Sequence, residues 1–307
     1  MRECGKFSQL ACALPDYVVV LVEGSDATKF LQGQLTCDVI KLADKCSTLA
    51  AHCDPKGKVN SLFRLVKFNP EQFWLILERS FLPSAINFLK KYAVFSKVTF
   101  TPLEQKYLYA FSLHRFTEIA TEIDFSVNSV ISLSSEQVTI KVDQANPYVL
   151  VVSNHLVDVN GEQVEWQLLA MQNGQPLLTL DNQAEFLPQA INLQCLEATI
   201  SFSKGCYIGQ EMVARAKYRG ANKRAMFTLV SEQNTGLALP KIGDGIELKL
   251  ETGWRKTGVI ISSIQIEERV WLQVVLNQDI ESEAIFRLSE QEEAKFIIAP
   301  LPYLITE

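Results

Sequence analysis

The chain has 307 residues, of which 48% are hydrophobic and 21% charged, and it carries a formal net charge of −6 at pH 7. This composition is that of a folded globular protein and excludes a disordered chain, while the negative balance argues against a general nucleic-acid coat. Because a single hydrophobic core stops growing at roughly 250–300 residues, the length predicts two or three packed subdomains.

The first predicted elements are a strand and a short helix. Tyr17–Val22 is a β-branched run and predicts a buried strand. Asp26 can then cap a helix through Phe30 and Leu31, which Gly33 is expected to end.

A hairpin is predicted next. The apolar segments Thr48–Cys53 and Val59–Phe68 flank Asp54–Gly57, in which proline and glycine favour a turn. A strand over Phe73–Leu77 and a helix over Ser80–Phe95, with Ser80 as its cap, are expected to follow.

The middle of the chain mixes strands with one helix. The helix is expected over Val164–Met171, where Gly174 and Pro176 stop it. Four strands precede it, at Val98–Phe100, Tyr107–Leu113, Val138–Val142 and Tyr148–Val152. Because strands and helices do not alternate regularly, the pattern predicts the α+β class and not a doubly wound parallel sheet.

The pattern changes after Arg224. Short strand candidates separated by turn residues predict a small antiparallel barrel or sandwich; they are Met226–Val230, Ile246–Leu250, Thr257–Ile264, Val270–Leu276 and Ala284–Leu288. We therefore expect one domain over residues 1–225, made of two packed subdomains, and a second over residues 226–307.

The cysteines and the apolar segments predict the cellular location of the protein. Seven cysteines, an odd number, occur without a CxxC pair, which is typical of reduced thiols in a reducing compartment. No signal peptide and no stretch of about 18 apolar residues are found. We expect a cytoplasmic monomer with no membrane association and no resident metal; His52, Cys53 and Asp54 share a turn without distant partner ligands.

The segment Ser203–Arg215 is the most informative stretch. It predicts a turn feeding a helix, in which Gly205 and Gly209 allow close backbone approach. If Cys206 lies near the helix start, backbone N–H groups and Lys204 would stabilise its thiolate. The alternative is a buried, inert cysteine, the commonest state of an unpaired cysteine.

The same region is strongly basic. Residues 204–224 contain six lysines and arginines and one acid, Glu211, so this segment carries +5 and the rest of the chain −11. A specific anionic partner would explain the contrast, and a solvated helix face would explain it equally well.

Lys204–Glu211 (KGCYIGQE) resembles the signature of the YgfZ family, which is related to glycine-cleavage aminomethyltransferases and to mitochondrial iron–sulfur assembly proteins. The resemblance spans almost the whole chain; its further pieces are Gly24–Asp26, Phe30–Thr36, Ala50–Lys58, Phe186–Ala190, Met212–Arg224 and Pro300–Tyr303. It implies an aminomethyltransferase-like folate-binding domain and a C-terminal antiparallel β-barrel, arranged around a central opening.

The resemblance also implies a function. The family binds tetrahydrofolate derivatives, is associated with maturing or repairing iron–sulfur enzymes such as the radical enzyme that methylthiolates tRNA, and is linked to replication initiation. Cys206 is then the functional thiol, with Lys204 and Glu211 beside it, at the mouth of a pterin-accepting cavity.

Two aromatic positions are implied as folate contacts, Tyr17 and Trp166, where the family often has tryptophan at the first. Aromatic faces suit a flat pterin, and Arg215 and Lys217 could meet the anionic glutamate tail. Trp166 could equally be packing, because its neighbours Leu168 and Leu169 are apolar.

Two other functions stay open. One is a folate-dependent one-carbon transferase, for which an acidic residue and not Cys206 would be essential. The other is direct tRNA binding by the basic segment, with Tyr207 and Tyr218 for stacking. The implied accessory role requires no turnover, so we lean against an enzyme.

Overall fold

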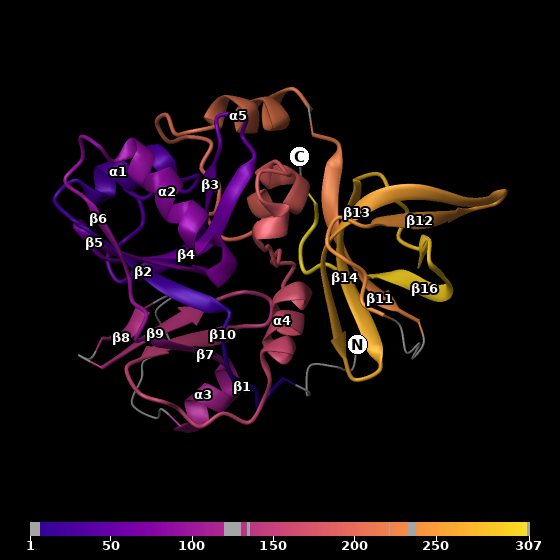
Figure 1. The fold of residues 1–307 in the computed structure, drawn as a ribbon, viewed down its shortest axis with the longest axis horizontal. Helices are drawn as coiled ribbons and strands as arrows, with labels where there is room; N and C mark the ends of the chain where they lie inside the picture. The colour runs from indigo at the N-terminus through magenta and orange to yellow at the C-terminus, as the bar shows by residue number, and fades with distance from the viewer. Residues whose placement is uncertain (1–6, 120–129, 134–135, 221, 233–237, 306–307) are drawn as a thin grey trace.

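The computed structural model describes residues 7–119, 130–133, 136–220, 222–232 and 238–305 (Figure 1). These residues form two five-stranded sheets and a closed six-stranded barrel, and every strand pair in them is antiparallel apart from an isolated bridge between Cys12 and Gly161. Helices lie against the sheets, so the α+β prediction is confirmed.

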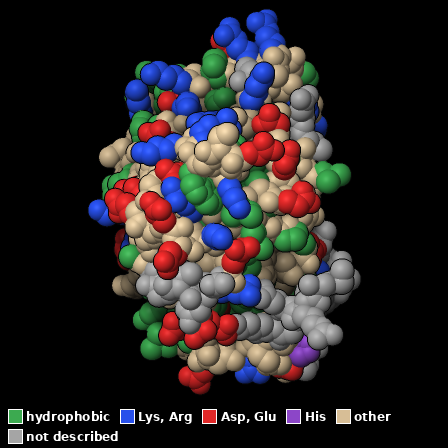
Figure 2. All heavy atoms as spheres, turned by 90° about the vertical axis from the view of Figure 1, so that its right-hand side faces the viewer, with side chains coloured by type: hydrophobic (Ala, Val, Ile, Leu, Met, Phe, Trp, Pro, Cys, Tyr) green, Lys and Arg blue, Asp and Glu red, His purple; other side chains and the backbone are tan. Residues whose placement is uncertain are grey.

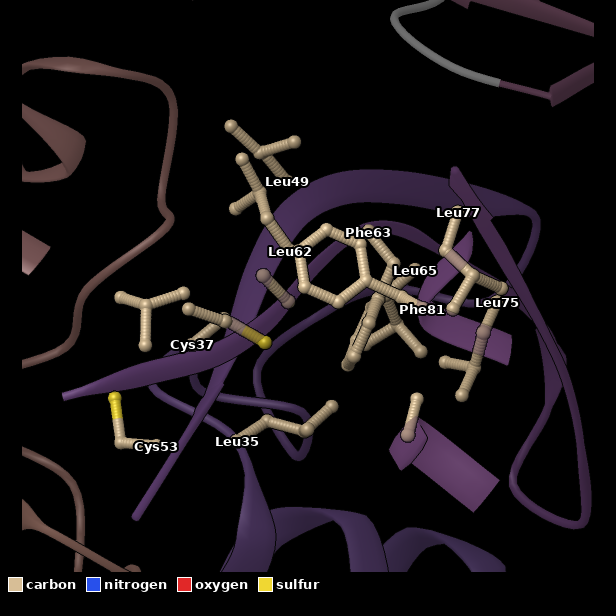
Figure 3. Close-up of a cluster of buried hydrophobic side chains, with 14 of the residues drawn as sticks. Leu35, Cys37, Leu49, Cys53, Leu62, Phe63, Leu65, Leu75, Leu77 and Phe81 are labelled. Carbon is tan, nitrogen blue, oxygen red and sulfur yellow. The ribbon is translucent and has the colours of Figure 1, made fainter. Parts of the chain in front are cut away.

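The first sheet carries the predicted hairpin. Its strand order is β3-β4-β5-β2-β6, with bounds Cys46–Cys53, Val59–Asn69, Gln72–Glu78, Tyr17–Glu23 and Thr99–Pro102. Helices α1 (Ala27–Gln34) and α2 (Leu82–Tyr92) accompany it. Leucine and phenylalanine side chains from β3, β4 and β5 meet Leu35 and Phe81 in one buried cluster (Figure 3).

Two expectations about helix ends were wrong. Gly33 lies inside α1, which continues to Gln34 because Leu35 N still donates to Leu31 O. Ser80 does not cap α2; it lies in a 3-10 turn over Arg79–Phe81, and the carboxylate of Glu78 accepts the hydrogen bond from Ser80 N. The cap is therefore the carboxylate of Glu78 at the end of β5, because a charged acceptor makes a stronger hydrogen bond than a hydroxyl.

The second sheet has the order β1-β7-β10-β9-β8, with bounds Ala11–Ala13, Tyr107–Ser112, Tyr148–Ser153, Gln137–Val142 and Val130–Leu133. Helix α3 (Leu113–Ile119) follows β7. Helix α4 (Gln163–Gln172) begins with a capping box between Glu162 and Glu165. The sequence analysis did not predict β1, β8 or α3, because three- to seven-residue elements show too few periods.

The C-terminal barrel runs β11-β14-β13-β12-β15-β16, with bounds Arg224–Ser231, Arg269–Asn277, Gly253–Ile266, Gly245–Leu250, Ile285–Leu288 and Gln291–Ala299. Phe286 and Phe296 fill its interior. Part of its outer wall is buried too, because Trp271 joins the core of the second sheet and Met226 that of the first. The barrel prediction is confirmed, but the acid-rich β16 was missed, since pairing overrides its low strand propensity.

Among the helices of the described residues, none is both long enough and apolar enough to cross a lipid bilayer.

Candidate functional site

The two predicted aromatic residues lie in contact. Tyr17 comes from β2 of the first sheet and Trp166 from α4, and their ring centroids are 5.1 Å apart at an interplanar angle of 83°. Trp166 is only 2% exposed, whereas Tyr17 is half-buried. Both line a hollow of about 40 Å³ between the sheets, with Arg64, Glu78 and other residues around it.

The residues that line this hollow include one with an unused donor, Trp166, and one with a carboxylate, Glu78. In the described part of the chain, the indole Nε1 of Trp166 is buried without a hydrogen-bond partner. An unpaired buried donor costs roughly 1–3 kcal/mol, so an acceptor supplied by a ligand would relieve it. Burial raises the pKa of Glu78. Tyr17 and Glu78 also line an adjoining hollow of about 140 Å³ that reaches Ser262–Ile264 of the barrel.

Arg64, which lines the hollow, forms a partly buried ion pair that the sequence analysis missed. Arg64 on β4 donates to both carboxylate oxygens of Glu197, at 2.7 and 3.2 Å, and Glu197 also accepts from Leu49 N at 2.9 Å. Burial by itself would raise the pKa of Glu197, but the charge of Arg64 and these hydrogen bonds outweigh it and hold that pKa below its ordinary value. Arg64 stands inside the apolar run Val59–Phe68, and a charged residue in a predicted buried strand would have indicated a buried acidic partner.

Cys206 is exposed, on the turn that precedes α5 (Gln210–Tyr218). The turn and helix were predicted, and the alternative of a buried cysteine is excluded. By contrast, Cys37 and Cys53 are sealed in the first core (Figure 3), and burial raises the pKa of Cys37 to about 12. Cys206 is therefore accessible to a partner in a way that these thiols are not.

Lys204 points inward and not toward the thiol. Its ammonium donates to three backbone carbonyls, those of Gln32, Leu35 and Cys37, at 2.6, 2.7 and 2.7 Å. Burial lowers its pKa to about 8, so the ammonium form still predominates at neutral pH. The expectation that Lys204 stabilises a Cys206 thiolate is therefore corrected: all three of its protons are used to hold the chain at the end of α1.

The hairpin turn and the signature turn touch through two glycines. Gly209, the N-cap of α5, has φ +81°, and a Cβ there would lie 2.5 Å from Asp54 O and 2.9 Å from Gly57 Cα. Ile208 N also donates to Gly33 O at 3.2 Å. Three segments far apart in the sequence thus meet and set the position of Cys206.

The other predicted residues lie on the surface of α5. Glu211 and Arg215 form an exposed ion pair of 2.6 Å, which contributes at most about 1 kcal/mol. The Nζ of Lys217 lies 3.8 Å from the ring centroid of Phe202. None of these residues lines the hollow at Tyr17 and Trp166.

Cys206 is not at the mouth of that hollow, contrary to expectation. The hollow touches Leu49 of β3, and the signature turn contacts the hairpin beyond Cys53. None of the signature residues Lys204–Glu211 lines the hollow. The sequence showed two motifs but not the distance between them. Among the described residues, no three His, Cys, Asp or Glu side chains gather as metal ligands would.

Comparisons with known proteins agree with this architecture. The family model described as "YgfZ, beta-barrel domain" matches residues 222–291. A Haemophilus influenzae protein described as uncharacterized is 45% identical, with 96% of this chain and 98% of the relative covered. The "tRNA-modifying protein YgfZ" of Pectobacterium carotovorum is 39% identical, covering 96% and 92%, and that of Photorhabdus laumondii is 38% identical over the same shares.

The fold also occurs among solved structures. The glycine cleavage system aminomethyltransferase T of Bartonella henselae superposes with a TM-score of 0.69, covering 99% of this chain and 89% of that one at 12% identity. The fold is therefore aminomethyltransferase-like. At this identity the likeness extends to the fold and not to the reaction.

Proposed function

This chain belongs to the YgfZ family, and from that membership we propose that it is a folate-binding accessory protein that acts in iron–sulfur cluster maturation or repair and thereby in tRNA methylthiolation. The observation that carries the proposal is the exposed thiol of Cys206, held in place by Lys204 and Gly209. A side chain that served packing alone would not need an exposed position on so constrained a turn.

The residues at the first hollow suit a folate. The Trp166 indole N–H can donate to an acceptor on the pterin edge, Glu78 can accept from its N–H groups, and the faces of Tyr17 and Trp166 suit its flat rings. The hollow of about 40 Å³ is smaller than the roughly 300–1,000 Å³ of ligand pockets. Binding therefore requires the half-buried Tyr17 to turn away from Trp166.

Trp166→Phe is expected to weaken tetrahydrofolate binding about tenfold, because it removes the one indole donor in the hollow and keeps an aromatic ring. Isothermal titration calorimetry of the purified protein measures this without depending on tryptophan fluorescence. Trp254→Phe is the matched control, since that indole stacks on Arg287 of the barrel. Equal affinities for the two variants would remove Trp166 from the folate site.

The thiol's role follows from its isolation. Iron–sulfur clusters are held by four cysteine or histidine ligands, so one exposed cysteine cannot retain a cluster alone. Cys206 would act transiently, on a cluster or a damaged site that a partner enzyme presents. An exposed thiol on a rigid turn is suited to that contact.

Cys206→Ser is expected to fold normally and to leave methylthiolated tRNA in a deletion strain at the level of the deletion itself, because serine keeps the shape and loses the thiolate. Mass spectrometry of tRNA nucleosides measures the modification. Cys46→Ser, which changes a half-buried thiol outside the signature, is the control and should restore it. Full restoration by Cys206→Ser would contradict the thiol's role.

Glu78 favours a second candidate, a folate-dependent one-carbon transferase. It is a carboxyl group with a raised pKa facing the hollow, as general acid–base catalysis requires. Incubation with methylene-tetrahydrofolate and candidate acceptors separates the two functions. Turnover that is lost in Glu78→Gln and kept in Cys206→Ser would favour the transferase.

A further inference from the structure

A basic surface runs along α5 into the start of β11. Arg219, Lys223 and Arg224 are exposed there, and among the described residues none of them has an acidic partner within ion-pair distance. Figure 2 shows lysine and arginine side chains gathered at the top of the molecule, at the height where Figure 1 places α5. On a protein of net charge −6, this surface is a local reversal of sign.

Two aromatic rings accompany these cations. Tyr218 is 68% exposed, and its ring centroid lies 6.3 Å from that of Phe202. The Nζ of Lys217 lies 3.8 Å from the centroid of Phe202 and 5.7 Å from that of Tyr218. Tyr207, which the sequence analysis offered as a stacking residue, is buried and unavailable, so Tyr218 is the exposed ring of this segment.

Phe202 also lines the roomiest hollow described here, a groove of about 490 Å³ between residues 37–48 and 198–203. This volume falls within the range of small-molecule sites. Four hydroxyl-bearing residues line it together with the ring, Ser47, Thr48, Ser201 and Ser203. Ser47 Oγ already accepts from Arg64 and Thr48 Oγ1 donates to Leu49 O, so Ser201 and Ser203 supply the hydroxyls for a ligand. A hydroxyl both donates and accepts, so these groups can pair with the polar edge of a planar ring.

We propose that a short single-stranded segment of RNA binds along α5, with its phosphates on Arg219, Lys223 and Arg224 and one base in the groove against Phe202. Cations that follow the backbone, aromatic rings between them and room for a planar polar group are the features of single-strand recognition. An acidic protein, the alternative partner, would pair with the cations but would not need the aromatic rings or the groove. The acidic remainder of the chain restricts the contact to this one surface.

Fluorescence anisotropy with a labelled single-stranded RNA, without folate or any partner enzyme, tests this inference separately from the proposed function. The logarithm of the association constant is expected to fall with the logarithm of salt concentration, and the double variant Arg219→Ala/Lys223→Ala to reduce the slope by about 1.4, or 0.7 per phosphate contact. The matched control is Lys90→Ala/Lys91→Ala, which removes two exposed cations of α2. A slope that falls equally in both variants would overturn the proposed surface.

The rings give the second test. Tyr218→Ala and Phe202→Ala are each expected to weaken RNA binding about tenfold, from the energy of one base–aromatic stack. The control is Tyr92→Ala on α2, whose ring also lies beside a lysine, Lys91, at 5.6 Å. An acidic peptide of matched charge should bind at least tenfold more weakly than RNA. Equal binding of peptide and RNA, or no loss in the ring variants, would overturn the proposal in favour of an acidic protein partner.

Discussion

Lys204→Met is expected to lower the free energy of unfolding by about 3–5 kcal/mol. The substitution keeps the apolar stem and removes the ammonium that binds the carbonyls of Gln32, Leu35 and Cys37. Each buried acceptor left unpaired costs roughly 1–3 kcal/mol, and some of that cost is recovered by water. A cation at the C-terminus of α1 is also favourable to the helix dipole. Urea unfolding followed by circular dichroism gives the difference.

Lys41→Met is the matched control for this measurement. Lys41 is near Gln32, Leu35 and Cys37 in the sequence, but its side chain is 71% exposed and forms a surface ion pair of 3.6 Å with Asp38. Such a surface pair is worth about 0–1 kcal/mol, so this variant should unfold almost like the unchanged protein. If Lys204→Met were no less stable than Lys41→Met, water would already satisfy the three carbonyls and Lys204 would not hold the turn.

The second large effect is expected from Gly209→Ala, which should destabilise the protein by about 2–5 kcal/mol. A non-glycine residue in the left-handed region costs roughly 1–2 kcal/mol, and φ at Gly209 is +81°. Relieving the overlap of the new Cβ with Asp54 O, 2.5 Å away, adds about 1–3 kcal/mol. The overlap is with backbone atoms, so it can be relieved only by separating the hairpin turn from α5.

Gly205→Ala provides the comparison, four residues earlier in the same signature. Gly205 has no positive φ, and within the described residues a Cβ there would have no neighbour within 4 Å. Its effect should be within 0.5 kcal/mol, either side of zero, as for other surface substitutions. Melting temperatures of the two variants, recorded together, would show whether the signature needs glycine at 209 specifically. Similar losses at both positions would contradict this account.

These two effects would explain why the signature extends well beyond the cysteine. Lys204 ties the turn to the end of α1, and Gly209 lets it pack on the hairpin turn at Gly57. Variants at either position should therefore lose thiol-dependent activity even though the sulfur atom of Cys206 is untouched. The signature therefore both contains the thiol of Cys206 and fixes its position.

The sequence by itself determined the local elements and the class of the fold. The β-branched runs, the turn Asp54–Gly57 and the glycine-rich signature each specify their conformation through neighbouring residues, and the structure has a strand, a hairpin turn and a turn followed by a helix at those places. The exceptions are the short elements β1, β8 and α3 and the strand β16. The acidic residues of β16 hide a strand that exists because β11 and β15 pair with it.

Only the tertiary structure decided the site. It brought Tyr17 against Trp166, directed Lys204 to three carbonyls, paired Arg64 with Glu197 across 133 positions of the sequence and kept Cys206 apart from the aromatic hollow. The physical reason is that these contacts join segments whose spacing along the chain carries no information about their separation in space. Side-chain direction depends on packing between layers, and that is settled only when the two sheets and the barrel come together.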